Sequence, residues 1–279
     1  MLDLVSLVAD TFSQSLADQF RRRYRSTAGA LTELVDSAAN LAIERIGVSN
    51  AAYHNFEHTM LVTEVGWDIL RGRQVHQEVS AEDAAHFLLA CLLHDIGYVR
   101  GICSGDVGNV VTINQEGDVI EWPRGASDAF LTPYHVDRSK LFIHERVSVH
   151  DLIDADRLAS AVELTRFPVP DDEDHQETDT EAGLVRAADL IGQLGDPYYL
   201  KKGNALFNEF QEIGVNERLG YSSPADLVER YPAFFWENAY PYLQPAIKYL
   251  DCTASGRNWI AHLYRHVFSA EHLDRLSTP

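Results

Sequence analysis

The chain has 279 residues, of which 46% are hydrophobic and 23% charged, a composition typical of globular proteins with a sizeable core. Its formal net charge of −19 at pH 7 would repel the phosphates of nucleic acids and anionic membrane surfaces, so neither is expected as a partner. Three cysteines at wide spacings argue against a disulfide framework or a zinc knuckle.

The N-terminal part of the chain is expected to be helical. Residues 2–48 carry apolar side chains at helical spacing and predict two helices. A third helix is expected to begin at residues 49–50, where a serine or an asparagine could cap it. It would continue through His54 and His58 to about Leu70.

The middle of the chain contains a buried helix and a change of pattern. The buried helix is expected to begin at Ser80 and to end near Gly97, because the segment between them is apolar on almost every face. Residues 107–123 are rich in β-branched side chains around a turn at 115–118, which predicts a β-hairpin insert. Further helices are expected at 139–149, 155–165, 182–195 and 204–272, the last with turns at 214, 222–224 and 255–256. The pattern predicts an all-α fold with a small β-hairpin insertion.

Five histidine and aspartate residues stand out. In the segment YHNFEH, His54 and His58 lie four residues apart, which on a helix would place both on one face. His94 and Asp95 close the buried helix, where a carboxylate and an imidazole are costly unless they are paired or bind metal. Asp189 interrupts another apolar helix and raises the same difficulty. Such mixed nitrogen and oxygen donors suit a divalent metal.

The order of these motifs resembles a known superfamily. An aromatic-His-Asn-x-x-His segment, an apolar run ending in His-Asp and a lone Asp on a later helix are similar to the HD-domain superfamily of metal-dependent phosphohydrolases. The form YHNFEH especially resembles the catalytic domain of class I cyclic nucleotide phosphodiesterases (PDEase). The resemblance covers about residues 50–200. It implies a single HD-type helical domain over 1–279, with helical extensions at 1–48 and 204–279.

The resemblance also implies roles for individual residues. His58, His94, Asp95 and Asp189 would bind one or two divalent metal ions, such as Zn, Mn, Fe, Mg, Ni or Co, with Asp95 bridging two ions. His54 would act as the general acid that protonates the leaving oxygen. The implied activity is hydrolysis of a phosphoester of a nucleotide, cyclic nucleotide or other small molecule by a metal-activated water. The metal would supply the positive charge that this acidic chain otherwise lacks.

Three further residues are candidates to meet the substrate. Arg166 and Lys201 could contact its phosphate, with surface salt bridges as the alternative for both. Tyr98 follows the His-Asp turn and could line the pocket.

Two other functions remain open at this stage. Diiron oxygenases on the same fold use two extra histidine ligands between the His-Asp pair and the last Asp, an interval that here contains His135, His144, His150 and His175. Where such an oxygenase would have a histidine pair, this chain has Thr165-Arg166, which favours a site with fewer nitrogen ligands. A metal-bearing module that senses a nucleotide without turnover is the other alternative.

The sequence also suggests a compartment and a state of assembly. The first residues carry Asp3 and lack the basic start of a signal peptide, and no apolar run has the length of a membrane helix, so we expect a cytoplasmic protein. The predicted hairpin could serve as a lid over the site or as a contact in a homodimer.

Overall fold

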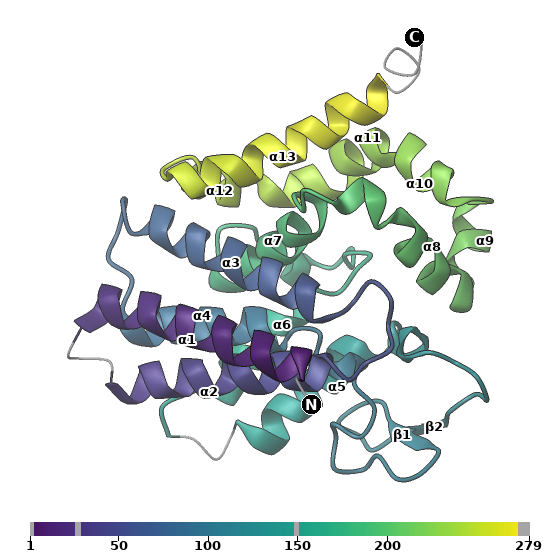
Figure 1. Ribbon diagram of the computed structural model, residues 1–279, viewed down its shortest axis with the longest axis horizontal. Helices are drawn as coiled ribbons and strands as arrows, with labels where there is room; N and C mark the ends of the chain where they lie inside the picture. The colour runs from purple at the N-terminus through teal and green to yellow at the C-terminus, as the bar shows by residue number, and fades with distance from the viewer. Residues whose placement is uncertain (1–2, 26–28, 148–150, 273–279) are drawn as a thin grey trace.

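The computed structural model describes residues 3–25, 29–147 and 151–272, and its fold is all-α with a small β-hairpin, as predicted (Figure 1). The first helices are α1 (Leu4–Tyr24), α2 (Gly29–Ile46), α3 (Phe56–Arg73) and α4 (Ala81–Leu93). After the hairpin come α5 (His135–Arg146), α6 (Ala155–Glu163), α7 (Glu181–Leu194), α8 (Gly203–Glu212), α9 (Val215–Leu219), α10 (Pro224–Glu229), α11 (Tyr231–Phe234), α12 (Tyr240–Leu250) and α13 (Ala254–Glu271). Short 3-10 turns occur at Ile96–Tyr98, Asp128–Leu131, Glu173–His175 and Tyr199–Lys201, and Phe235–Ala239 is a π-helical turn.

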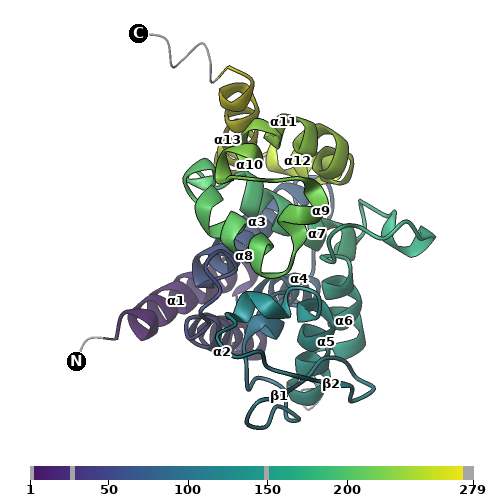
Figure 2. The same ribbon diagram turned by 90° about the vertical axis from the view of Figure 1, so that its right-hand side faces the viewer.

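The hairpin consists of two short strands on the outer edge of the molecule, visible in both ribbon views (Figure 2). Strand β1 (Val110–Thr112) pairs antiparallel with β2 (Val119–Glu121), with Val111 opposite Ile120. The turn between them includes Gly117 at φ +82°, a conformation that favours glycine. The hairpin predicted over residues 107–123 is therefore confirmed.

Helix α3 lies at the centre of the fold, packed against α4, α7 and α12 (Figure 1). Its close approach to α7 depends on Gly192, because a Cβ atom built there would lie 2.9 Å from the Cα and N atoms of Val62. Val62 is about one helical turn from His58 on α3, and Gly192 is about one helical turn from Asp189 on α7. The contact between the two helices therefore brings the side chains of His58 and Asp189 together. No helix in the described part of the chain combines the length and apolar character needed to cross a membrane.

We expect Gly192→Ala to destabilise the protein by about 1–3 kcal/mol and to weaken any zinc binding by the candidate ligands His58 and Asp189, because the backbone of α3 would have to move away from α7. Gly29→Ala is the matched control, since a Cβ there meets nothing within 4 Å. Urea denaturation and a zinc titration measure the two effects. Equal stability and zinc affinity in the Gly192 variant and the wild type would contradict this account of the α3–α7 contact.

Four predicted helix boundaries differ clearly from the structure, and one of them is the start of α5, which begins at His135 rather than at residue 139. The third helix begins at Phe56 rather than at residues 49–50, because Asn55 caps it: its side-chain oxygen accepts hydrogen bonds from the backbone N–H groups of Glu57 and His58. His54 therefore precedes the helix instead of lying on it. The α-helix of α4 ends at Leu93 and then tightens into the 3-10 turn. The predicted turn at 255–256 lies inside α13, since the break falls before the N-cap Thr253.

The turn after α4 is braced by a fully buried arginine. Arg138 of α5 is 0% exposed, and its guanidinium donates hydrogen bonds to the carbonyl oxygens of Gly97, Val99 and Thr112. It also donates to both carboxylate oxygens of Asp106, at 3.0 and 2.9 Å. One side chain thus connects the turn, the loop that follows it and strand β1.

Candidate metal centre

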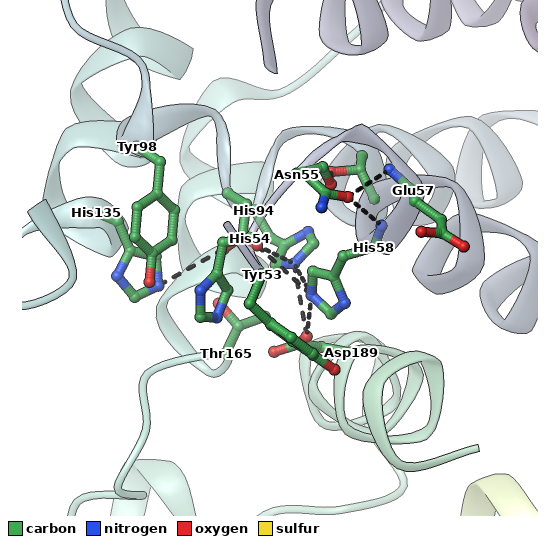
Figure 3. A network of polar contacts seen from close by, with 12 residues as sticks. Tyr53, His54, Asn55, Glu57, His58, His94, Tyr98, His135, Thr165 and Asp189 are labelled. Atoms are coloured by element: carbon green, nitrogen blue, oxygen red, sulfur yellow. Dashed lines mark hydrogen bonds and ion pairs between the residues drawn. The ribbon is translucent and has the colours of Figure 1, made fainter. Parts of the chain in front are cut away.

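Four of the predicted ligands converge on one point in the structure (Figure 3). His58 comes from the first turn of α3, His94 and Asp95 from the turn after α4, and Asp189 from the middle of α7. The side chains of the first three are at most 4% exposed, whereas that of Asp189 is 17% exposed. The buried His58-His94-Asp95 group could hold a metal ion.

The spacing of the donor atoms suits a single ion. The His58 Nε2 atom lies 3.4 Å from His94 Nε2 and 3.1 Å from Asp189 Oδ1. Asp95 Oδ2 lies 3.3 Å from His94 Nε2 and 3.5 Å from His58 Nε2, and His94 Nε2 lies 3.5 Å from Asp189 Oδ1. Ligands bound about 2.1 Å from a tetrahedral ion would be about 3.4 Å apart. The donors are therefore already spaced as a metal would require.

The protonation states also fit a cation. His94 Nδ1–H donates to the carbonyl oxygen of Cys91 at 2.8 Å, so in the neutral ring the lone pair lies on Nε2, directed at the cluster. Burial opposes a charge on His94, but the carboxylates of Asp95 and Asp189 raise its pKa, and a metal ion would replace the proton that they favour on Nε2. Burial alone would raise the pKa of Asp95 and Asp189, but the neighbouring imidazoles outweigh it and hold the pKa of both carboxyls well below the usual range. Among the described residues, buried Asp95 Oδ2 has no hydrogen-bond partner. An anionic oxygen without a donor is the arrangement expected of a metal ligand.

A further histidine approaches the same aspartate from its other side. His135 Nδ1–H donates to the carbonyl oxygen of Thr132 at 2.7 Å, and its Nε2 lies 3.7 Å from Asp95 Oδ1. Asp95 thus presents one oxygen to His58 and His94 and the other to His135. Of the three among these histidines that the structure describes, His135 is the one that lies at the site.

The other three histidines lie elsewhere or cannot be placed. His144 Nδ1 is 3.7 Å from Asp156, and His175 Nδ1 is bonded to Asp172 at 2.6 Å. His150 lies outside the described residues.

His54 is held by a glutamate that the sequence did not single out. Glu209 of α8 accepts from His54 Nδ1–H at 2.6 Å and from the backbone N–H groups of Tyr53 and His54 at 2.6 and 3.3 Å. Burial opposes the charged imidazole, but the carboxylate of Glu209 and, more weakly, those of Asp95 and Asp189 raise the pKa of His54 to about 9. The two partners are 155 residues apart, so no local pattern could have indicated the pair.

Tyr98 reaches the site as a stacking partner of two imidazoles. Its ring lies 4.7 Å from that of His54 and 4.5 Å from that of His135, with interplanar angles of 14° and 19°. Tyr98 is 1% exposed, and its hydroxyl group is 3.3 Å from Thr132 Oγ1. Tyr98 is thus joined to both histidines, and its contact with a substrate stays a prediction.

The two predicted phosphate contacts are not joined to the cluster. Arg166 Nη2 donates to Asp137 and Glu163, both at 2.9 Å. Lys201 is exposed, with its Nζ 5.1 Å from the ring centroid of Tyr198. Their contacts with a substrate phosphate stay predictions.

The neighbouring cation, Lys202, is paired with the residue that precedes the candidate ligand His58. Its Nζ is 2.9 Å from Glu57 and 2.6 Å from Asp196. Glu57 immediately precedes His58, so this ion pair ties the chain before α8 to the first turn of α3.

Comparison with known proteins gives one finding about the family. A search of curated proteins finds no match to this chain. The family model described as Npun_R2479-like matches residues 2–273, which include every helix and strand of the fold and all the site residues described above. The chain therefore belongs to the Npun_R2479-like family.

Proposed function

We propose that this protein is a metal-dependent phosphohydrolase of the HD-domain type, which hydrolyses a phosphoester of a nucleotide, cyclic nucleotide or other small molecule. The observation that carries the proposal is the meeting of four donor atoms, 3.1–3.5 Å apart in each measured pair, beside the glutamate-bound His54. The order of motifs in the sequence, which resembles class I phosphodiesterases, supports the same chemistry.

The spacing of the donor atoms supports the binding of a divalent ion. His58, His94, Asp95 and Asp189 would hold the first ion, and Asp95 with His135 would hold a second. When bound, such ions supply a Lewis acid for the phosphoryl oxygens and activate water as the nucleophile. The protein contributes a largely buried site, in which these charges act with little screening by solvent.

His54 would provide the proton that the leaving oxygen needs. Because Nδ1–H is bonded to Glu209, the Nε2–H of the imidazolium remains available for donation. A pKa of about 9 keeps His54 protonated at neutral pH. Proton transfer from Nε2 to the departing alkoxide yields the alcohol and leaves a neutral imidazole, which regains its proton from solvent.

We expect Glu209→Gln to lower kcat by about 10- to 100-fold, since it removes the charge that supports protonated His54. Protonated His54 is the active form, so activity is lost as pH rises through its pKa; without Glu209 this loss should occur at lower pH than in the wild type. A kcat–pH profile of both proteins measures the shift. Glu212→Gln is the matched control, because Glu212 lies on the same helix but binds Ser127 instead. An unshifted alkaline limb would contradict the role of Glu209.

The proposal is tested with a panel of phosphomonoesters, cyclic nucleotides and nucleotides. The protein is stripped with a chelator and then reloaded separately with zinc, manganese, magnesium, iron, nickel and cobalt. Release of phosphate or of a ring-opened nucleotide that depends on metal and is lost in His54→Ala would support it. If a loaded protein binds nucleotides but no preparation turns over any member of the panel, the sensing module is favoured instead.

A diiron oxygenase is the second candidate, and His135 is the observation that favours it. It adds a nitrogen donor 3.7 Å from Asp95, as an oxygenase site with more histidine ligands would require. The test measures oxygen consumption with small organic substrates. Consumption by the iron-loaded protein and none by the zinc-loaded protein would support the oxygenase.

A further inference from the structure

Tyr98 stacks on both of the imidazoles beside the proposed site, whose own ring centroids are 6.5 Å apart, and it restricts both. Its ring is nearly parallel to those of His54 and His135. Glu209 fixes the direction of His54 Nδ1 within the ring plane, and stacking on Tyr98 restrains the plane itself. On the other side, Thr132 is the hydrogen-bond partner of both the Tyr98 hydroxyl and His135 Nδ1.

The β-hairpin forms the outer support of this tyrosine. Tyr98 belongs to a small hydrophobic cluster separate from the main core, together with Val111, Trp122 and Leu131. Val111 lies on β1, and Trp122 directly follows β2. All four side chains are 7% exposed or less. The hairpin therefore buries Val111 and Trp122 in the same cluster as the stacked tyrosine.

Trp122 is itself held firmly in this cluster. Its ring packs edge-on against Phe130 at 5.6 Å between centroids, and the guanidinium of Arg100 lies 4.3 Å from its centroid. The opposite side of the hairpin carries Val119, which is 56% exposed. One face of the hairpin thus carries the cluster residues Val111 and Trp122, and the other face carries the exposed Val119.

We infer that the hairpin over residues 107–123 is a positioning element, which acts through Tyr98 to set the ring planes of His54 and His135. Neither a lid over the substrate nor a dimer contact is needed to explain its presence. Its effect on turnover rests on the proposed function, whereas its effect on the two imidazoles does not. Tyr98 is accordingly a positioning residue, since it acts through the histidines rather than on the substrate.

The test compares Trp122→Ala with Trp122→Phe in the full chain loaded with zinc. NMR of histidine-labelled protein reads the ring-current shifts that Tyr98 imposes on the imidazole C–H protons of His54 and His135, assigned with His→Gln variants. We expect Trp122→Ala to change both sets of shifts and Trp122→Phe to retain them. Val119→Ala, on the exposed face of the same hairpin, should leave them unchanged. Val111→Ala provides a milder change if the alanine variant at 122 does not fold.

Kinetics with a substrate found in the panel supply the second measurement. Trp122→Ala should lower kcat by about 10- to 100-fold through misplacement of His54, with KM changed less than about twofold. Unchanged imidazole shifts in folded Trp122→Ala and Val111→Ala would overturn the inference, and so would a rise in KM at constant kcat, which a lid would produce. If the wild type turns over nothing, the proposed function fails, and the NMR shifts alone decide whether the hairpin positions the histidines.

Discussion

Asp95→Ala is expected to leave the protein without bound metal and to reduce turnover by about a thousandfold or more, a loss of about 4 kcal/mol of transition-state stabilisation. Asp95 is the one residue of the described cluster that faces both candidate ion positions: Oδ2 lies 3.3 Å from His94 Nε2, and Oδ1 lies 3.7 Å from His135 Nε2. Without it, each position loses an anionic oxygen. The two metals would then compete with protons for the remaining imidazoles.

Elemental analysis of protein purified without added metal measures this prediction directly. The wild type should contain one to two transition metals per chain, and Asp95→Ala almost none. Asp156→Ala is the matched control, because the side chain of Asp156 is 92% exposed and lies outside the cluster. Equal metal content in wild type and Asp95→Ala would remove Asp95 from the ligand set. No metal in either protein, even after reconstitution with zinc or manganese, would make the cluster purely structural.

The convergence of the candidate ligands His94, Asp95 and Asp189 could be predicted because these residues stand in apolar segments. His94 and Asp95 end a helix that is buried from residue 84 to residue 93, and Asp189 interrupts the apolar residues of α7. Polar groups in such positions need partners. Imidazole nitrogens and carboxylate oxygens can share a proton, or they can bind the same metal ion. The apolar neighbours that make these residues stand out in the sequence also pack their helices together, and this packing places the polar side chains close to one another.

The position of His54 could have been predicted better. A helix through both histidines of YHNFEH was inferred from their spacing, but Asn55 is as good an N-cap as the residues at 49–50. Because the helix begins after it, His54 sits on the preceding loop and is free to turn toward Glu209. Of these two histidines, four residues apart, His58 lies on the helix and His54 on the loop before it. Their imidazole rings are in a T-shaped arrangement, with centroids 5.8 Å apart.

Other parts of the site depend on contacts between distant segments, for which the sequence has no local signal. Glu209 lies in α8, within a stretch that the sequence pattern indicated only as helical. Arg138 lies among Asp137 and Lys140 at the start of α5, which resembles a solvated helix start. Its partner Asp106 is in a loop 32 residues earlier. Only the path of the chain through the hairpin brings the two together.

Arg138→Leu is expected to destabilise the protein by about 3–5 kcal/mol, because it leaves the buried carboxylate of Asp106 without its counter-charge. Three backbone carbonyl groups would also lose their donor, and the turn that carries His94 and Asp95 would lose its brace. Urea denaturation measures the change; Arg124→Leu, the same substitution at an exposed position, should stay within about 0.5 kcal/mol of wild type. Adding Asp106→Leu to Arg138→Leu should cost less than the sum of the two single changes, since the double variant buries no unpaired charge. A loss below about 1 kcal/mol for Arg138→Leu alone would show that the turn is held by its packing and not by this ion pair.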